Sequence, residues 1–482
     1  MRTAYSVETV RAAEQRLMER LPEGALMQRA AAGLAVACAQ LLGRVYGGRV
    51  VLLVGSGDNG GDALYAGARL ARRGAAVTAV LLAPDRTHAG GLAALLRAGG
   101  RTVAPDAAEE PVLHADLVLD GIVGIGGRGG LRPDAARLTT LAGDSRGVVV
   151  AVDLPSGVEA DTGEVRGAAV RADLTVTFGT HKPGLLIDPA REYAGSVRLV
   201  DIGLGAELPV EPELEALQHA DVAALLPVPG AESDKYRRGV VGIAAGSGRY
   251  PGAAVLAVAG ALRGGAGAVR YVGPAADAVI ARFPEALVSD RGPAKAGRVQ
   301  AWVVGPGAGD DAATVAEVVT ADVPVLIDAD GLRLADPEAV RARTAPTLMT
   351  PHAGEAAALL GVPRAEVEAA RLTSVRELAR RYGATVLLKG STTLVADSGG
   401  GAVRVNPTGT GWLATAGSGD VLSGLAGSLL AAGLPAFDAG SVGAYLHGLA
   451  GRLAADGAPV GAHDVADAVR TAWRDVRDAG RV

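Results

Sequence analysis

Residues 406–433 read NPTGTGWLATAGSGDVLSGLAGSLLAAG. A glycine-rich turn, Gly417-Ser418-Gly419, delivers Asp420 to the start of an apolar stretch that is typical of a buried helix. Glycines let the backbone N–H groups point inward, and a helix N-terminus adds partial positive charge, so the turn suits a phosphate. Asp420 is well placed there to take a proton from a hydroxyl that attacks this phosphate. An acidic residue that only stabilises the helix dipole would give the same motif, and the motif alone leaves both interpretations open.

The composition narrows the class of protein. A chain of 482 residues can form roughly two or three domains with cores of their own. Its net charge of −5 offers no basic stripe, so we expect no nucleic-acid partner. Cys38 is the only cysteine, which excludes an internal disulfide and fits a reducing cytoplasm. The N-terminus does not read as a signal peptide, and the longest apolar run, near Pro251–Leu262, is too short to span a bilayer. We therefore expect a cytoplasmic protein with no membrane association.

The first half of the chain alternates short apolar runs with helical stretches. Residues 5–42 predict two helices that are separated at Pro22-Glu23-Gly24. Apolar strands separated by helices predict a mostly parallel sheet covered on both faces, with ligands beyond the carboxyl ends of the strands. The predicted strands are Arg49–Val54, Ala76–Leu82, Leu117–Asp120, Val148–Val152, Leu174–Phe178 and Val197–Val200.

Polar residues follow three of these strand ends. The loop Gly55–Asp62 fits the dinucleotide pattern G-x-G-x-x-G, but no acidic residue ends the second strand, so we reject an ordinary Rossmann cofactor site. We expect Asn59, Asp120, Asp153 and Ser156 to meet in one crevice, where hard oxygen donors suit an alkali or alkaline-earth cation. Each of these residues alone is also typical of a turn or a cap. The segment His181–Gly184 either reaches the same rim or is a solvated loop.

A second α/β series follows a proline-rich segment. We predict a linker over residues 211–238 that separates a domain of residues 1–210 from one of residues 239–482. No P-loop pattern occurs in the sequence, so another architecture must hold phosphates. The predicted strands of the second series are Val240–Ala245, Ala268–Val272, Ala301–Val304, Val323–Ile327, Thr347–Met349 and Val386–Leu388.

The motifs of the first half, over about residues 1–205, resemble the NAD(P)H-hydrate epimerases. The matching blocks are Gly60-Gly61-Asp62, Asp120 leading into Gly124–Gly130, Asp153–Gly157 and Asp161–Gly163, whereas Asp58 stands where the family usually has an asparagine. The resemblance implies a Rossmann-like domain and a potassium ion near Asn59, Asp120 and Ser156. Epimerisation by reversible loss of water needs one carboxylate that transfers protons, and we expect this residue to be Asp153. The implied contacts with the hydrated nicotinamide nucleotide are Asp58, Asn59, Gly60, Gly61, Asp62, Gly124, Ile125, Gly126, Gly127, Arg128, Gly129, Gly130 and Asp153.

The second half resembles the ribokinase-like fold and, within it, the ADP- or ATP-dependent NAD(P)H-hydrate dehydratases. The matching blocks are Tyr250–Ala254, Gly305-Pro306-Gly307, Thr350–Glu355, Leu388-Lys389-Gly390 and Ala414–Leu422. Ala353 replaces a usual proline, and Gly409-Thr410-Gly411 departs from a Gly-Asn-Pro run. The resemblance implies that Asp420 is the base and that the hydrated nucleotide contacts Ala253, Gly307, His352 and Asp420. The implied contacts with the second nucleotide are Lys389, Gly390, Ser391, Thr392, Thr393 and Gly419.

Together the two resemblances predict an α/β protein with two three-layer αβα domains, Rossmann-like and then ribokinase-like. They imply an enzyme that epimerises hydrated NADH and NADPH and dehydrates one epimer with ADP and Mg²⁺, and we expect a homo-oligomer. One alternative is a ribokinase-like vitamin or sugar kinase with an accessory N-terminal nucleotide-binding domain, since the motif at Asp420 would serve it equally. Another is a non-catalytic, nucleotide-sensing or protein-binding role for the first half.

Overall fold

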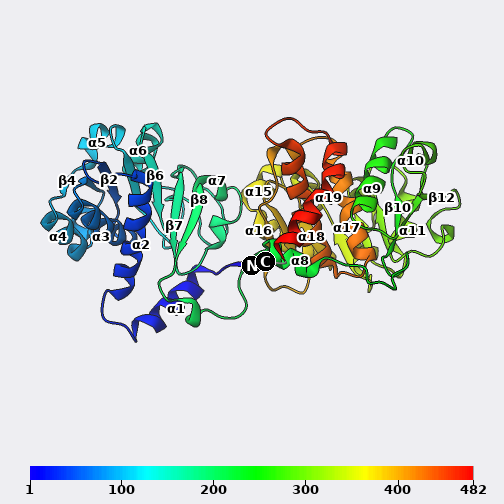
Figure 1. The fold of residues 1–482 in the computed structure, drawn as a ribbon, viewed down its shortest axis with the longest axis horizontal. Helices are drawn as coiled ribbons and strands as arrows, with labels where there is room; N and C mark the ends of the chain where they lie inside the picture. The colour runs from blue at the N-terminus through cyan, green and yellow to red at the C-terminus, as the bar shows by residue number, and fades with distance from the viewer. Residues whose placement is uncertain (481–482) are drawn as a thin grey trace. The chain divides into compact units, whose positions relative to one another are not determined.

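The computed structural model describes residues 1–480 and divides into two units (Figure 1). The first unit comprises Thr3–Glu213, and the second comprises Met1–Arg2 together with the chain from Leu214 onward. Both contain a mainly parallel sheet between layers of helices, which confirms the predicted fold class.

A parallel sheet of seven strands forms the middle layer of the first unit, in the order β4-β3-β2-β5-β6-β7-β8. Its central strands are buried on both faces because α2 and α3 cover one face and α5 and α6 the other. The strands are β2 (Arg49–Val54), β3 (Ala76–Leu81), β4 (Arg101–Val103), β5 (Leu117–Gly121), β6 (Val148–Val152), β7 (Leu174–Phe178) and β8 (Ser196–Val200). The helices are α1 (Val7–Met18), α2 (Ala25–Leu42), α3 (Asp58–Arg72), α4 (Ala89–Arg97), α5 (Glu109–Leu113), α6 (Pro133–Asp144) and α7 (Arg191–Ala194).

The two N-terminal helices form where the sequence predicts them. The Ser6 side chain caps α1 by accepting a hydrogen bond from the Thr9 backbone N–H, and α2 begins after Gly24, whose φ is 74°. By length and composition α2 could cross a membrane, a property that the sequence analysis did not assign to it. Its buried side chains, including Leu26 and Leu34, belong to the core of the first unit.

The sheet of the second unit has eleven strands in the order β1-β9-β18-β17-β16-β15-β14-β13-β10-β11-β12. The strands from β10 to β16 run parallel, and β17 is antiparallel to both of its neighbours. The strands are β1 (Arg2–Ala4), β9 (Leu214–Ala216), β10 (Val240–Ala244), β11 (Ala268–Val272), β12 (Leu287–Ser289), β13 (Ala301–Val304), β14 (Val325–Ile327), β15 (Thr347–Met349), β16 (Thr385–Leu388), β17 (Thr393–Ala396) and β18 (Val403–Asn406). The helices are α8 (His219–Leu225), α9 (Pro251–Arg263), α10 (Ala276–Arg282), α11 (Ala312–Val319), α12 (Asp330–Leu334), α13 (Pro337–Arg341), α14 (Ala353–Leu360), α15 (Arg364–Ala369), α16 (Arg371–Tyr382), α17 (Ser418–Ala431), α18 (Ala436–Ala455) and α19 (Ala462–Ala479).

The proposed linker differs from the structure. Residues 211–238 contain β9, which pairs with β18, and α8, whose Val222 is fully buried in the core of the second unit. This part of the segment belongs to the second unit, because its apolar residues complete that core.

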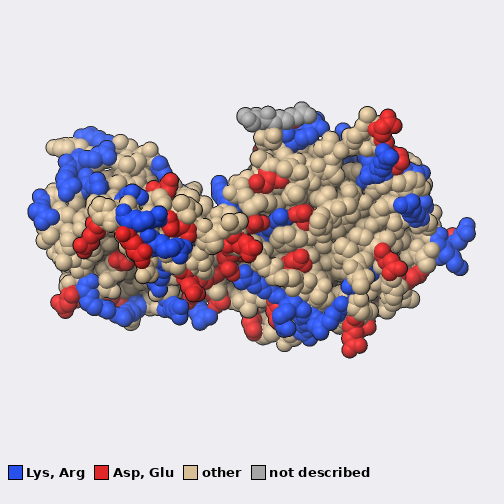
Figure 2. Space-filling model, turned by 90° about the horizontal axis from the view of Figure 1, so that it is seen from below, with Lys and Arg blue, Asp and Glu red and all other residues tan. Residues whose placement is uncertain are grey.

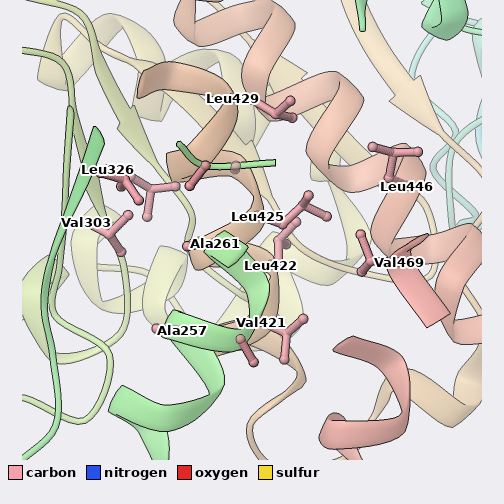
Figure 3. Packing of buried hydrophobic residues seen from close by; sticks show 14 of the residues in the cluster. Ala257, Ala261, Val303, Leu326, Val421, Leu422, Leu425, Leu429, Leu446 and Val469 are labelled. Atoms are coloured by element: carbon pink, nitrogen blue, oxygen red, sulfur yellow. The ribbon is translucent and has the colours of Figure 1, made fainter. Parts of the chain in front are cut away.

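Helix α17, which carries Asp420, packs against α9 with almost no side chains between the two backbones. A Cβ atom at Gly424 would lie 1.9 Å from the Ala257 carbonyl oxygen, and one at Gly260 would lie 2.1 Å from that of Val421. Figure 3 shows Ala257 on α9 close to Val421 and Leu422 of α17. Only glycine fits at these contacts, so they fix the position of α17 relative to α9.

Candidate active sites

The Asp153 carboxylate and the Lys182 ammonium form a buried ion pair in the first unit. Asp153 follows β6 with a φ of 66°, an unusual backbone conformation for a residue with a side chain. Its Oδ1 accepts hydrogen bonds from Lys182, from the Thr177 hydroxyl at 2.9 Å and from the Phe178 N–H at 3.2 Å. These three donors, all on the same oxygen, fix the orientation of the Asp153 carboxylate.

Asp62 on α3 supplies a second buried carboxyl group, whose Oδ1 has no hydrogen-bond partner among residues 1–480. Burial raises the pKa of Asp62 well above its ordinary value, and the negative charges of Asp153, Asp58 and Glu14 raise it further. The pKa of the Glu14 carboxyl on α1 is also raised, first by its burial. The site therefore combines a carboxylate neutralised by lysine with a carboxyl that favours its protonated form.

The polar groups predicted to hold a cation come from the start of α3, the end of β5 and the loop after β6. The Asp120 carboxylate at the end of β5 accepts hydrogen bonds from the Ser156 hydroxyl at 2.6 Å and the Ser156 N–H at 2.7 Å. Burial raises the pKa of Asp120 to about 6, although the bonds from Ser156 oppose this shift. The Asn59 amide donates to the Val152 carbonyl at 2.6 Å. This leaves the Asn59 Oδ1 as a further hard oxygen, like those of Asp120 and Ser156, so the donor set fits an alkali cation.

The predicted glycine loops lie around these groups. A Cβ at Gly60 would lie 2.5 Å from the Gly55 carbonyl oxygen, and one at Gly124 would lie 2.6 Å from the Asn59 Oδ1, so both glycines allow close approach. Asp58 is exposed at the N-terminus of α3, and Ile125 packs partly into the core. The remaining predicted contacts of the second loop lie at the surface or half-buried: Gly126, Gly127, Arg128, Gly129 and Gly130.

In the second unit, Asp420 belongs to a cluster of three carboxylates around one lysine. The Lys389 Nζ lies 2.6 Å from the Asp328 Oδ1 and 3.7 Å from the Glu355 Oε2. The pKa of Asp420 is raised to about 7, mainly by burial and then by the negative charge of Asp328, while Lys389 lowers it. Asp420 therefore changes protonation near neutral pH, as a general base must.

The first turn of α17 holds Asp420 in place. Gly417 begins the turn with a φ of 87°, and Gly419 lies close to Lys389 and Asp328. The Ser423 hydroxyl, one turn into α17, donates to the Asp328 Oδ2 at 2.6 Å and so connects the helix to the end of β14. Backbone N–H groups of this turn face the same end of the helix as Asp420, which makes it suitable for an anion.

Residues predicted to contact the hydrated nucleotide come from three different loops. A Cβ at Gly307 would lie 2.7 Å from that of Ala253, so the loop after β13 contacts the start of α9 directly. His352 caps α14: its Nδ1 accepts from the Glu355 N–H at 3.0 Å, and the Glu355 carboxylate accepts from the His352 N–H at 2.7 Å. The His352 side chain is otherwise exposed, with a relative accessibility of 58%.

The predicted nucleotide-binding segment after β16 is divided between surface and core. Gly390 and Ser391 are exposed in the turn between β16 and β17, whereas Thr392 and Thr393 are buried. The Arg371 guanidinium donates to the Lys389 and Thr392 carbonyl oxygens at 3.1 and 3.0 Å, which fixes the turn.

Sequence reasoning missed two charged partners in these sites. Lys182 was left as either a rim residue or part of a solvated loop, yet only 1% of it is exposed. Asp328 was not assigned to the site, although it directly follows β14 at the carboxyl end of the sheet, the position that the strand-end rule singles out.

Known proteins with the same organisation were found by comparison of sequence and structure. A family described as YjeF-related protein N-terminus matches residues 23–184, and one described as NAD(P)H-hydrate dehydratase matches residues 241–472. The bifunctional NAD(P)H-hydrate repair enzyme Nnr of Mycobacterium leprae is 51% identical over 456 residues, which cover 93% of each chain. The protein of that name from Mycobacterium tuberculosis strain H37Rv is 52% identical over 448 residues, or 91% of each chain.

A solved structure resembles the second unit. The ADP/ATP-dependent NAD(P)H-hydrate dehydratase of Bacillus subtilis, co-crystallised with ATP and Mg²⁺, is 31% identical with a TM-score of 0.51. The match covers 55% of this chain and 99% of that one. The order of the two domains and the identity to the mycobacterial enzymes across nearly the whole chain agree, and the chain belongs to the family of bifunctional NAD(P)H-hydrate repair enzymes.

Proposed function

We propose that this chain restores NADH and NADPH from their hydrated forms in two steps. The first unit interconverts the R and S epimers, and the second dehydrates the S epimer with ADP, which yields AMP and phosphate. The observation that carries the proposal is that each unit holds its own carboxylate beside a lysine, Asp153 with Lys182 and Asp420 with Lys389 and Asp328, in a chain of this family.

Epimerisation needs reversible loss of water from the hydroxyl-bearing ring carbon. The ring nitrogen lone pair drives the hydroxyl out, and the protonated Asp62 carboxyl gives it the proton with which it leaves as water. The water then returns to the other face of the planar cation, where the Asp153 carboxylate takes up its proton. Proton exchange with solvent afterwards restores the acid form of Asp62 and the carboxylate form of Asp153. The Lys182 ammonium contacts the Asp153 Oδ1 and holds the carboxylate in place during this exchange. The substrate lies over Asp58–Asp62 and Gly124–Gly130.

A potassium ion fits the oxygen atoms of Asn59, Asp120 and Ser156 in this proposal. When bound, it supplies positive charge close to the nucleotide and favours the ionised form of Asp120. Asp120 and Ser156 also position each other through their two hydrogen bonds.

Dehydration begins when Asp420 takes the proton of the ring hydroxyl as that oxygen attacks the β-phosphorus of ADP. A bond from the ring oxygen to phosphorus forms, and the bond from phosphorus to the oxygen of AMP breaks. The ring nitrogen then expels phosphate, and loss of a proton from the neighbouring ring carbon regenerates the dihydronicotinamide. The oxygen of the former hydroxyl leaves in phosphate, a far better leaving group than hydroxide.

The residues around Asp420 have supporting roles. The backbone N–H groups of the turn at Gly417–Gly419 stabilise negative charge on the transferred group. Ala253, Gly307 and His352 contact the hydrated nucleotide, and Lys389–Thr393 with Gly419 hold ADP. Among residues 1–480 no group of three or more acidic, histidine or cysteine side chains could hold a metal. Mg²⁺ bound with the ADP phosphates would neutralise part of their charge. A homo-oligomeric state and a cytoplasmic location remain predictions.

The test is to supply the full chain with a mixture of hydrated NADH epimers, ADP and Mg²⁺ and to follow dihydronicotinamide absorbance and free phosphate. We expect complete recovery in the wild type, and recovery of only the S fraction in Asp153→Asn. Asp420→Asn should keep epimerisation but lose dehydration by about 10²–10⁴-fold. A stable phosphorylated product without phosphate release would instead support a kinase.

A further inference from the structure

A groove lined with arginines lies in the second unit, away from Asp420. Its volume is about 450 Å³, within the size range of small-molecule sites. Its floor and walls include Trp473, Pro227 and Val228, and no acidic residue of the described chain lines it. The six arginines that line it are Arg237, Arg238, Arg263, Arg470, Arg474 and Arg477.

The spacing of residues on α19 creates one side of this groove. Four residues of α19 follow one another in steps of three, one and three positions: Arg470, Trp473, Arg474 and Arg477. At this spacing they share one face of the helix. Arg263 in the last turn of α9 faces the same groove, as do the two arginines that precede β10. Three separate segments thus direct guanidinium groups to one place.

Most of these charges are not neutralised by the protein. Within residues 1–480, Arg263 is the only one of the six in an ion pair, with Asp467 at 2.9 Å. The Nε of Arg477 is buried and has no hydrogen-bond partner within the described part of the chain, residues 1–480. Arg263 and Arg477 lie in the last turns of their helices, where the negative end of the helix dipole stabilises a positive charge. Arg470 and Arg474 lie further from the helix end, so the dipole does not explain their presence.

The positive charge of the groove contrasts with the charge of the rest of the molecule. The chain carries a net charge of −5, and on the face drawn in Figure 2 acidic side chains are interspersed with basic ones. Like charges brought together without counter-ions repel one another, so such a cluster is unfavourable unless an anion binds there.

We propose that this groove binds a nucleoside polyphosphate at a second site, distinct from the dehydratase site. Guanidinium groups bind phosphate oxygens through paired hydrogen bonds, and the Trp473 indole with the neighbouring prolines offers a surface for a base. Helix α17 separates the two sites: Asp420 lies in its first turn, and Ala432, which follows its last residue, lines the groove. Its 14 residues place them about 20 Å apart.

The test counts ATP sites by calorimetry on the full chain without hydrated nucleotide. The wild type should bind two ATP molecules per chain, of which the dehydratase site accounts for one. Arg470→Ala/Arg474→Ala should lose the second site, with affinity reduced at least about 100-fold, while dehydration is unchanged. Both side chains are exposed, so folding should be retained. The exposed pair Arg72→Ala/Arg73→Ala in the first unit removes the same charge and should keep both sites.

A second comparison separates a nucleotide site from a site for polyphosphate alone. Trp473→Ala should weaken ATP binding at the second site and leave inorganic triphosphate binding unchanged. A single ATP site in the wild type, two sites in the double variant, or equal affinity for ATP and triphosphate would each overturn the proposal. It would also be overturned if the double variant only dissociated an oligomer in light scattering, because the groove would then be an interface between copies.

Discussion

The Lys182 ammonium contacts the Asp153 carboxylate where both side chains are largely buried. Two buried charges depend on each other, because removal of one leaves the other unpaired in a medium of low dielectric constant. Lys182 thereby holds the Asp153 carboxylate in the orientation that the proposed proton transfer requires.

Lys182→Met should therefore lose epimerase activity by about 10²–10⁴-fold and reduce the free energy of unfolding by about 3–5 kcal/mol. Epimer exchange and thermal unfolding of the full chain measure the two effects. Lys295→Met, which changes an exposed lysine in the second unit, is the control and should alter neither. Normal epimerisation in Lys182→Met would show that Asp153 does not need its partner.

Asp62→Asn should change how the stability of the chain depends on pH. The pKa of Asp62 is raised in the folded state, so the folded chain holds a proton that the unfolded chain releases, and this stabilisation is lost as pH rises through the folded pKa. Asparagine cannot ionise, so the free energy of unfolding of the variant relative to wild type should be greater at about pH 8 than at about pH 5. Thermal unfolding at both pH values checks this, with the exposed Asp134→Asn as the control. A constant difference would mean that Asp62 is ionised throughout.

The dehydratase should show an acidic limb in kcat/KM with a midpoint near pH 7, because Asp420 must be deprotonated and its pKa is about 7. Asp328→Asn should move this limb to lower pH, since the negative charge of Asp328 raises the pKa of Asp420. Asp330→Asn is a matched control: that carboxylate bonds the Gly309 N–H and should produce a smaller shift. A limb that stays in place in Asp328→Asn would exclude Asp420 as the titrating group.

Potassium should stabilise the first unit against heat more than sodium at equal ionic strength. A ligand that binds only the folded state stabilises it by about 2.7 kcal/mol at a hundred times its dissociation constant. Asp120→Asn should abolish the difference between the two salts, because it removes the charged oxygen from the donor set. If the wild type responds equally to both cations, no selective site exists at Asn59, Asp120 and Ser156.

The main strands could be predicted because runs such as Arg49–Val54 and Val148–Val152 are apolar and lie between helices. Three of the strands that were not predicted have weaker patterns. In β4 and β12 most side chains are exposed at the edges of the sheets, and β9 has only three residues within a proline-rich segment. Such strands form because they pair with a neighbouring strand, and their own sequence does not indicate that pairing.

In the candidate sites, too, some residues could be predicted from the sequence and others could not. Asp153 and Asp420 could be identified because they follow a strand or begin a helix within recognisable motifs. Lys182 could not, because a lysine in a loop reads as solvated, and its burial depends on the fold around Asp153. The ion pair of Lys389 with Asp328 joins the ends of two strands separated by 61 residues of sequence, so it too required the structure.

The contact between α9 and α17 has a consequence for how the reaction centre tolerates change. Gly424 lies one turn beyond Asp420 and touches the neighbouring backbone with no intervening atoms. A methyl group added at Gly424 would overlap the backbone of α9 and push α17 outward. Asp420 lies about 6 Å along the helix axis, so its carboxylate would move as well. The position of Asp420, the proposed base, thus depends on a glycine that lies in the contact between two helices.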